Sequence, residues 1–304
     1  AIPPSMRPHK MLPFLTRHWK SRHIVSRLIE QDEIAAVILL GGFVAVPSEA
    51  AARQCGIPTL LVNLDRVPGR ANRWMRPKVT RAVSGVTTTS PFCETTLGMP
   101  IRNASKPPGD RATCKEQLNV DVKKPVLLAV GASQGAGSIN TLLPTLAARR
   151  PDLMDPWQII HVTGTRGHED ACRRWQDTNQ NPLIFEFQHE MGPLWGAADL
   201  VISRAGACSV AEIEFAGCPA IYLPYPHHRD QHQRHNAAPA CEAGAAICIT
   251  DSSHADQTCE DLLSMCEELL ARGPALEAMQ TAAKMRSGQD AGAHIAAEAL
   301  KLAL

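Results

Sequence analysis

The chain has 304 residues, of which 44% are hydrophobic and 20% charged, and its formal net charge is +1. This composition predicts a globular protein of one large or two medium domains, and the low net charge argues against nucleic acid as a partner. No apolar run approaches the roughly 18 residues of a membrane span, and the N-terminus does not resemble a signal peptide. The ten cysteines include no C-x-x-C pair, so we expect reduced thiols and no metal or cofactor in a cytoplasmic chain.

The first stretch of the chain is basic. Residues 1–29 contain six lysines and arginines and no acidic residue, and apolar side chains such as Trp19 lie between them. Such a stretch is attracted to an anionic membrane surface. It is equally typical of an amphipathic helix whose apolar face packs on the domain, and both can hold at once.

Apolar runs alternate with helical stretches from there on, which predicts a parallel α/β architecture. In the first half we expect strands within 33–42, 57–64 and 79–90, and a helix at 47–56 that is stopped by Gly56. In the second half the expected strands lie within 125–130, 157–164, 183–188, 199–206, 218–226 and 245–250, and the expected helices lie within 139–150, 168–178, 190–198, 209–217, 230–244, 256–273, 275–288 and 293–304.

This order predicts two Rossmann-like domains. The expected boundaries are an N-terminal domain at 1–97, a Pro- and Gly-rich linker at 98–123 and a C-terminal domain at 124–275. The helices of 276–304 are expected to pack back on the N-terminal domain.

Three motifs in the second half suggest chemistry. A glycine-rich turn, "VGASQGAGSIN" (130–140), follows a strand and opens a helix whose N–H groups suit phosphate, although an empty turn explains it as well. In "ADLVISRAGACSVAEIEFAGCPAIYLPYP" (198–226), Ser209 and Glu212 fit a capping box. They equally fit a helix start that meets a diphosphate while the carboxylate accepts from ribose hydroxyls. The histidines of "HHRDQHQRHNA" (227–237) indicate a polar binding wall more than a zinc site.

The ordered set "GASQGAGSIN", "FQHEM", "ADLVISRAGACSVAE", "GCPAIYLPYP" and "DQHQRHNA" resembles the MurG family, peptidoglycan N-acetylglucosaminyltransferases that convert lipid I to lipid II. The earlier segments "LLGGFVAVPSEAAARQCGIPTLL", "VPGRANR" and "GMPIRNA" agree with it. The resemblance implies an α/β protein of the GT-B fold, with two Rossmann-like domains, the donor cleft between them and UDP-N-acetylglucosamine (UDP-GlcNAc) held by the C-terminal domain. The residues that it assigns to the donor are Arg102, Ser133, Gln134, Gln188, Ala207, Cys208, Ser209, Val210, Ala211, Glu212 and Gln233. Gln188 stands where the family usually has an apolar residue against uracil.

The acceptor side departs from the family. The family's opening strand and G-x-G-G-H loop, with its candidate catalytic histidine, have no counterpart here, so the N-terminal domain is expected to be truncated. The family's H-E-Q-N stretch is replaced by "VNLD", whereas the acceptor-side glycines Gly41 and Gly42 are retained. The catalytic base is therefore unassigned, and Asp65 is a weak candidate.

The implied reaction is an inverting transfer of GlcNAc to an undecaprenyl-linked muramyl-pentapeptide by a peripheral enzyme on the inner face of the plasma membrane. No D-x-D motif occurs, so the helix start at 207–212 and the glycine turn are expected to stabilise the leaving diphosphate. Three alternatives stay open. They are another glycolipid acceptor, a non-catalytic or partner-dependent UDP-sugar-binding protein, and a true start that lies upstream.

Overall fold

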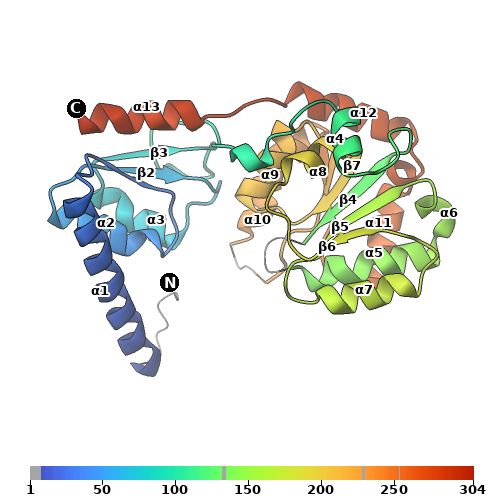
Figure 1. The fold of residues 1–304 in the computed structure, drawn as a ribbon, viewed down its shortest axis with the longest axis horizontal. Helices are drawn as coiled ribbons and strands as arrows, with labels where there is room; N and C mark the ends of the chain where they lie inside the picture. Colours follow the sequence, from blue (N-terminus) through green and yellow to red (C-terminus); the bar gives the residue numbers. More distant parts are fainter. Residues whose placement is uncertain (1–7, 132–134, 228–229, 253) are drawn as a thin grey trace. The chain divides into compact units, whose positions relative to one another are not determined.

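A computed structural model describes residues 8–131, 135–227, 230–252 and 254–304 (Figure 1). The chain forms two compact units. The N-terminal unit consists of the residues up to Pro100 together with Asp290–Leu304, and the C-terminal unit is Ile101–Gln289. Across the described ranges, no helix is both long and apolar enough to cross a membrane.

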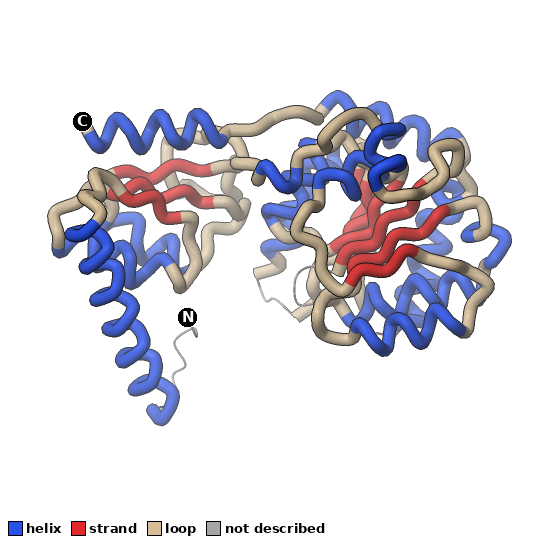
Figure 2. The backbone as a smooth tube through the Cα atoms, in the orientation of Figure 1, coloured by secondary structure: helices blue, strands red, loops and turns tan. Residues whose placement is uncertain are grey.

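The N-terminal unit is a small parallel sheet between helical layers (Figure 2). Its strands lie in the order β1-β2-β3. Helices α2 and α3 cover one face around Leu61 and Met75, and α13 covers the other face around Val62 and Ile295. The elements are α1 (Pro8–Gln31), β1 (Val37–Leu39), α2 (Ala45–Gln54), β2 (Thr59–Asn63), α3 (Arg70–Met75), the 3-10 turn Arg76–Lys78, β3 (Arg81–Ser84) and α13 (Gly292–Ala303).

The two ends of this unit are fixed by packing. Helix α1 runs along α2, where Ile29 meets the buried Ala51 and Ala52. The last helix is held by an ion pair between Arg81 and Glu298, with 2.8 Å between Nη2 and Oε2. Residues 8–29 of the basic stretch therefore belong to a helix that packs on its unit, which agrees with one of the two interpretations of the sequence.

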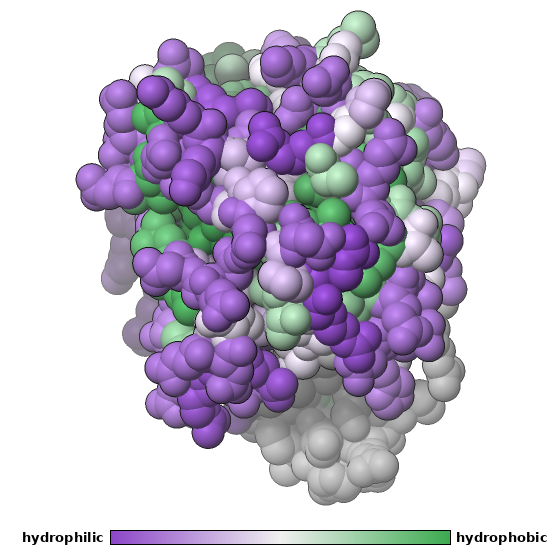
Figure 3. All heavy atoms as spheres, turned by 90° about the vertical axis from the view of Figure 1, so that its right-hand side faces the viewer, coloured by the Kyte–Doolittle hydropathy of each residue, from purple (hydrophilic) through white to green (hydrophobic). Residues whose placement is uncertain are grey.

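The C-terminal unit contains a six-stranded parallel sheet in the order β6-β5-β4-β7-β8-β9. One face packs against α5, α11 and α12, and the other packs against α8, α9 and α10. Its surface in the view from the right-hand side of Figure 1 is mostly hydrophilic, with apolar side chains interspersed (Figure 3). The elements are the 3-10 turn Asn103–Ser105, α4 (Arg111–Gln117), β4 (Val126–Val130), α5 (Gly137–Arg149), α6 (Pro151–Met154), β5 (Gln158–Val162), α7 (His168–Gln176), β6 (Leu183–Phe185), α8 (Gly192–Ala197), β7 (Leu200–Ser203), α9 (Ala207–Phe215), β8 (Ala220–Tyr222), α10 (His232–Glu242), β9 (Ala246–Cys248), α11 (Ala255–Leu270) and α12 (Pro274–Met285).

This strand order creates a topological switch point beside β4. The chain starts at the central strand β4, moves outward to β6 and then returns to lay β7 on the other side of β4. In doubly wound sheets of this order, ligands bind outside the carboxyl ends of the strands where the direction reverses. Both glycine-containing turns of the sequence, after β4 and after β7, lie at that point.

The units divide at residues that differ from the predicted boundaries. The predicted linker at 98–123 includes α4, which belongs to the C-terminal unit because Lys115 and Arg111 form ion pairs with Asp199. The predicted segment 276–304 is divided between the two units. Helix α12 packs on the C-terminal unit through Leu276 and Met279, whereas α13 packs on the N-terminal unit. The sequence did not predict α4, because its polar residues are typical of a linker although Arg111 and Lys115 form ion pairs within the fold.

Candidate functional site

The two glycines Gly131 and Gly135, which follow β4, are closely packed against backbone atoms. Gly135 has φ +82°, and a Cβ there would lie 2.6 Å from the Thr163 carbonyl oxygen. A Cβ on Gly131 would lie 2.6 Å from the amide nitrogen of Ala136. These glycines are required by the chain itself, so their presence alone does not identify a ligand site. The predicted donor residues Ser133 and Gln134 lie outside the described residues.

The turn after β7 leads into α9, which begins earlier than predicted. Gly206 is the N-cap residue, and no side chain caps the helix. The predicted capping box with Ser209 at the N-cap is therefore wrong, because Ser209 lies inside the first turn and Glu212 one turn further on. The helix start at Ala207 still presents backbone amides and the positive end of the helix dipole at the switch point, which suits a diphosphate.

Glu212 is the most constrained of the predicted donor residues. Only 5% of the residue is exposed, and both carboxylate oxygens accept hydrogen bonds. Oε1 accepts from Nε of Arg102 at 3.0 Å, and Oε2 accepts from the indole Nε1 of Trp195 at 3.3 Å. The fold thus brings together Arg102 and Glu212, two predicted donor residues that are far apart in the sequence. Trp195 was not predicted, because its short helix has no motif that indicates a role.

A buried cluster ties the surrounding strand ends together. Arg204, which is 8% exposed, forms an ion pair with Asp251 at 2.7 Å and donates to Oγ of Ser138 at 2.8 Å. Ser138 in turn donates to Asp251 at 2.6 Å, and Arg204 also donates to the carbonyl oxygen of Leu223. The start of α5 and the ends of β7, β8 and β9 are fixed against one another in this way. Sequence inspection missed the cluster because its members are distant along the chain.

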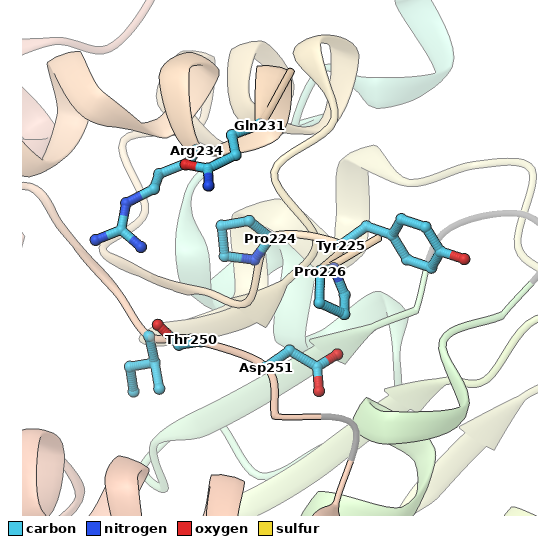
Figure 4. A pocket seen from close by; sticks show the side chains of 8 residues that line it. Pro224, Tyr225, Pro226, Gln231, Arg234, Thr250 and Asp251 are labelled. Carbon is cyan, nitrogen blue, oxygen red and sulfur yellow. The ribbon is translucent and has the colours of Figure 1, made fainter. Parts of the chain in front are cut away.

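The third predicted motif lies around the start of α10. A cavity of about 120 Å³ opens here between the α10 start and the segments that follow β8 and β9 (Figure 4). The amide of Tyr225 donates to Oε1 of Gln233 at 2.8 Å, so this predicted donor-sugar residue now holds the loop. His232 pairs with Asp230, with 2.9 Å between Nδ1 and Oδ1. The cavity is lined by Pro224, Tyr225, Pro226, Gln231, Arg234, Ile249, Thr250 and Asp251.

Gln188 lies beyond the end of β6 and is half-buried, next to Phe187, which is 55% exposed. Within the predicted helix-start segment, Val210 and Ala211 are buried and Cys208 is exposed.

The predicted acceptor-side residues gather at the carboxyl edge of the N-terminal sheet. Gly41 and Gly42 follow β1 with φ of +86° and +73°, and Asp65 follows β2. The amide of Gly42 donates to Oδ1 of Asn72 at 3.1 Å, and Nδ2 of Asn72 donates to Oδ1 of Asn63 at 3.0 Å. Asn63 also donates to the carbonyl oxygen of Asp65 at 2.7 Å. Two buried amides therefore fix both loops in place.

Comparison with known proteins identifies the family. The family models for the glycosyltransferase family 28 C-terminal and N-terminal domains match residues 126–295 and 4–84. The UDP-N-acetylglucosamine–N-acetylmuramyl-(pentapeptide) pyrophosphoryl-undecaprenol N-acetylglucosamine transferase of a Synechococcus species is 32% identical over 78% of this chain and 64% of its own length. The transferase of the same name from Methylococcus capsulatus is 33% identical over 89% of this chain and 73% of its own length.

A solved structure agrees with the sequence matches. The crystal structure of Acinetobacter baumannii MurG superposes with a TM-score of 0.69 at 27% identity, over 95% of this chain and 79% of that one. The chain spans roughly two thirds of the length of the curated relatives that it matches. It has the α/β GT-B fold, and it belongs to the MurG family within glycosyltransferase family 28.

Proposed function

We propose that this chain transfers N-acetylglucosamine from UDP-GlcNAc to the N-acetylmuramyl-pentapeptide of an undecaprenyl-pyrophosphate lipid, the lipid I to lipid II step of peptidoglycan synthesis. The observation that supports it most is the contact of Arg102 with Glu212 beside the start of α9. A cation, a carboxylate and a helix N-terminus at the switch point match the diphosphate and ribose of a nucleotide sugar.

In this proposal the donor diphosphate lies against the α9 start and the Glu212 carboxylate accepts from the ribose hydroxyls. An acceptor hydroxyl attacks the anomeric carbon with inversion and passes its proton to a base, and the bond to the diphosphate oxygen breaks so that UDP leaves. Backbone amides at the α9 start stabilise the charge that develops on UDP. The Arg204, Ser138 and Asp251 cluster keeps the strand ends around this point rigid.

The transfer itself is tested with labelled UDP-GlcNAc and a lipid-linked muramyl-pentapeptide acceptor. We expect a labelled disaccharide lipid from the wild-type chain and a large loss of product in Glu212→Ala. Binding of UDP-GlcNAc without transfer, under conditions in which a longer relative turns over, would instead support a non-catalytic or partner-dependent UDP-sugar-binding protein. Turnover with a different glycolipid alone would indicate another acceptor class.

The base is tested separately. Asp65 at the end of β2 is the proposed candidate, and Asp65→Asn is expected to lower kcat while leaving donor affinity unchanged. Asp155→Asn on the C-terminal unit is the matched control. An unchanged kcat in Asp65→Asn would remove this residue from the mechanism.

We also propose that the N-terminal unit binds the anionic inner face of the plasma membrane. Helix α1 presents Trp19 with 66% of the residue exposed, near Arg17 and Lys20. A cavity of about 360 Å³ opens beside it, lined by Leu15, His18, Phe43, Val46, Arg70, Ala71 and Trp74. Exposed apolar and aromatic side chains among cations favour the headgroup region of anionic bilayers.

Vesicle co-sedimentation tests this surface. The wild-type chain is expected to bind phosphatidylglycerol vesicles more strongly than phosphatidylcholine vesicles, and the difference should shrink in a Trp19→Ala, Trp74→Ala double variant. Met285→Ala removes an apolar side chain that is 83% exposed on the C-terminal unit and serves as control. Equal binding by all three proteins would contradict the membrane proposal.

A further inference from the structure

The two oxygens of the Glu212 carboxylate have different surroundings. Its side chain is 7% exposed and that of Arg102 is 58% exposed, so the partner of Oε1 lies at the surface. Oε2 points the other way and meets the indole of Trp195, which is 1% exposed. One oxygen thus has a partner within the core, and the other has a partner that borders solvent.

Trp195 is held firmly in its place. It lies on α8, and it packs in the apolar layer between the sheet and the helices α8 to α10. Its backbone amide donates to the carbonyl oxygen of Met191 at 3.0 Å, and its carbonyl oxygen accepts from the thiol of Cys218 at 2.9 Å. A buried indole N–H requires an acceptor, and Glu212 is the acceptor that this N–H has.

Arg102 is a more replaceable partner. Its guanidinium also donates to Oγ of Ser105 at 3.0 Å, and most of its side chain is in solvent. When a ligand hydroxyl donates to Oε1 in place of Nε, Arg102 keeps Ser105 and solvent as partners and Oε1 keeps a donor, so no buried group is left without a hydrogen bond. Displacing the indole from Oε2 would instead leave a buried donor unsatisfied, which is far more costly.

We propose that Trp195 is a positioning residue for donor recognition. Its indole N–H holds Oε2 of Glu212, so that Oε1 faces the ribose hydroxyls of a nucleoside diphosphate sugar, and these hydroxyls displace Arg102. This inference rests on the proposed function. It assigns ribose selectivity to a residue that itself does not touch the ligand.

The test removes the N–H and keeps the shape. Trp195 is replaced by benzothienylalanine, in which sulfur stands in place of the indole nitrogen, and UDP-GlcNAc and its 2′-deoxyribose analogue are titrated calorimetrically. The matched control is the same replacement at Trp157, whose Nε1 donates to the carbonyl oxygen of Leu270 at 2.8 Å in the buried core. Hydrogen bonds to charged groups imply that the wild type prefers the ribose form by about tenfold or more.

We expect that preference to fall to about twofold or less in the Trp195 isostere and to persist in the Trp157 isostere. An unchanged preference at position 195, or an equal loss at both positions, would overturn the inference. If the Trp195 isostere does not fold, the inference is tested in the wild type by the nuclear magnetic resonance signal of the Trp195 indole N–H. It should shift on addition of UDP-GlcNAc and in Glu212→Gln, and a constant signal would overturn the inference. A wild-type chain that binds neither nucleotide would instead contradict the proposed function.

Discussion

His161 is a buried histidine whose ring serves the fold in its neutral form. Nδ1 accepts from the indole of Trp175 at 3.0 Å, and Nε2 lies 3.2 Å from Oδ1 of Asn140. Burial, together with the neighbouring His168, lowers the pKa of His161 from 6.5 to about 4. Because the unfolded chain binds the proton more readily, stability is complete above about pH 6.5 and is lost as the pH falls toward about 4.

We therefore expect the free energy of unfolding of the C-terminal unit to fall with acid, by up to roughly 3 kcal/mol from this residue. Urea titrations followed by tryptophan fluorescence at several pH values measure this. His161→Gln should be less stable at neutral pH and show a shallower pH dependence, and the exposed His189→Gln should behave as the wild type. An identical pH dependence in all three proteins would rule out this role of His161.

Gly135 sets the geometry of the turn that begins at the switch point. Gly135→Ala would combine an unfavourable left-handed φ with a Cβ placed against the Thr163 carbonyl oxygen, and we expect a destabilisation of about 2–4 kcal/mol. Gly244→Ala has a similar φ of +72° but open space around the new Cβ, so it should cost only about 1 kcal/mol. Thermal unfolding measures the stability of both variants. Equal losses of stability would mean that the backbone around Gly135 can move to accommodate the methyl group.

At the level of single residues, the sequence indicated which residues lie together better than it indicated where a helix begins. The resemblance assigned Arg102 and Glu212 to one site, and the fold brings them into contact. The local pattern misplaced the start of α9, because a Ser three residues before a Glu fits a capping box whether or not the helix begins there. Trp195 and Asp251 could not be predicted, since their contacts are made only when distant segments pack.

Helix α13 illustrates how an element can belong to a unit that is distant in sequence. Ile295 is 4% exposed and packs against the strand residues Val62 and Val83. Ile295→Ala should therefore destabilise the N-terminal unit by about 2–4 kcal/mol. Limited proteolysis with mass spectrometry would show cleavage that is faster within residues 37–84 and unchanged within the C-terminal unit. Leu300→Ala on the same helix, 64% exposed, is the control, and equal protection in both variants would contradict this packing role.

The helices and strands of the chain were largely predictable, and the exceptions have physical causes. The order of apolar runs predicted both parallel sheets, because strands buried on two faces give continuous apolar stretches. The periodicity of 275–288 could not show which unit its helix joins, because an apolar face predicts that the helix packs against another element without indicating which one. Helix α4 was not predicted, because its charged residues Arg111 and Lys115 are typical of an exposed loop, whereas in the fold both form ion pairs with the buried Asp199.

For the whole molecule, the switch point of the C-terminal sheet connects the fold with the proposed chemistry. The six-stranded order puts the turn after β4 next to the start of α9, and packing beneath that start fixes Glu212. A nucleotide sugar is the ligand class that this combination favours. The N-terminal unit supplies a separate carboxyl edge with the fixed Gly42 loop. The central claim is therefore that Glu212 binds the donor nucleotide.

Calorimetric titration of UDP-GlcNAc into the wild type, Glu212→Ala and Glu214→Ala tests that claim most directly. Glu214 lies on the same helix and forms a partly exposed ion pair with Arg286, so it is the matched control. We expect Glu212→Ala to weaken binding by about tenfold or more, as the loss of charge-assisted hydrogen bonds implies, with Glu214→Ala close to the wild type. Equal affinities in all three folded proteins would contradict the account and leave Glu212 with a structural role alone.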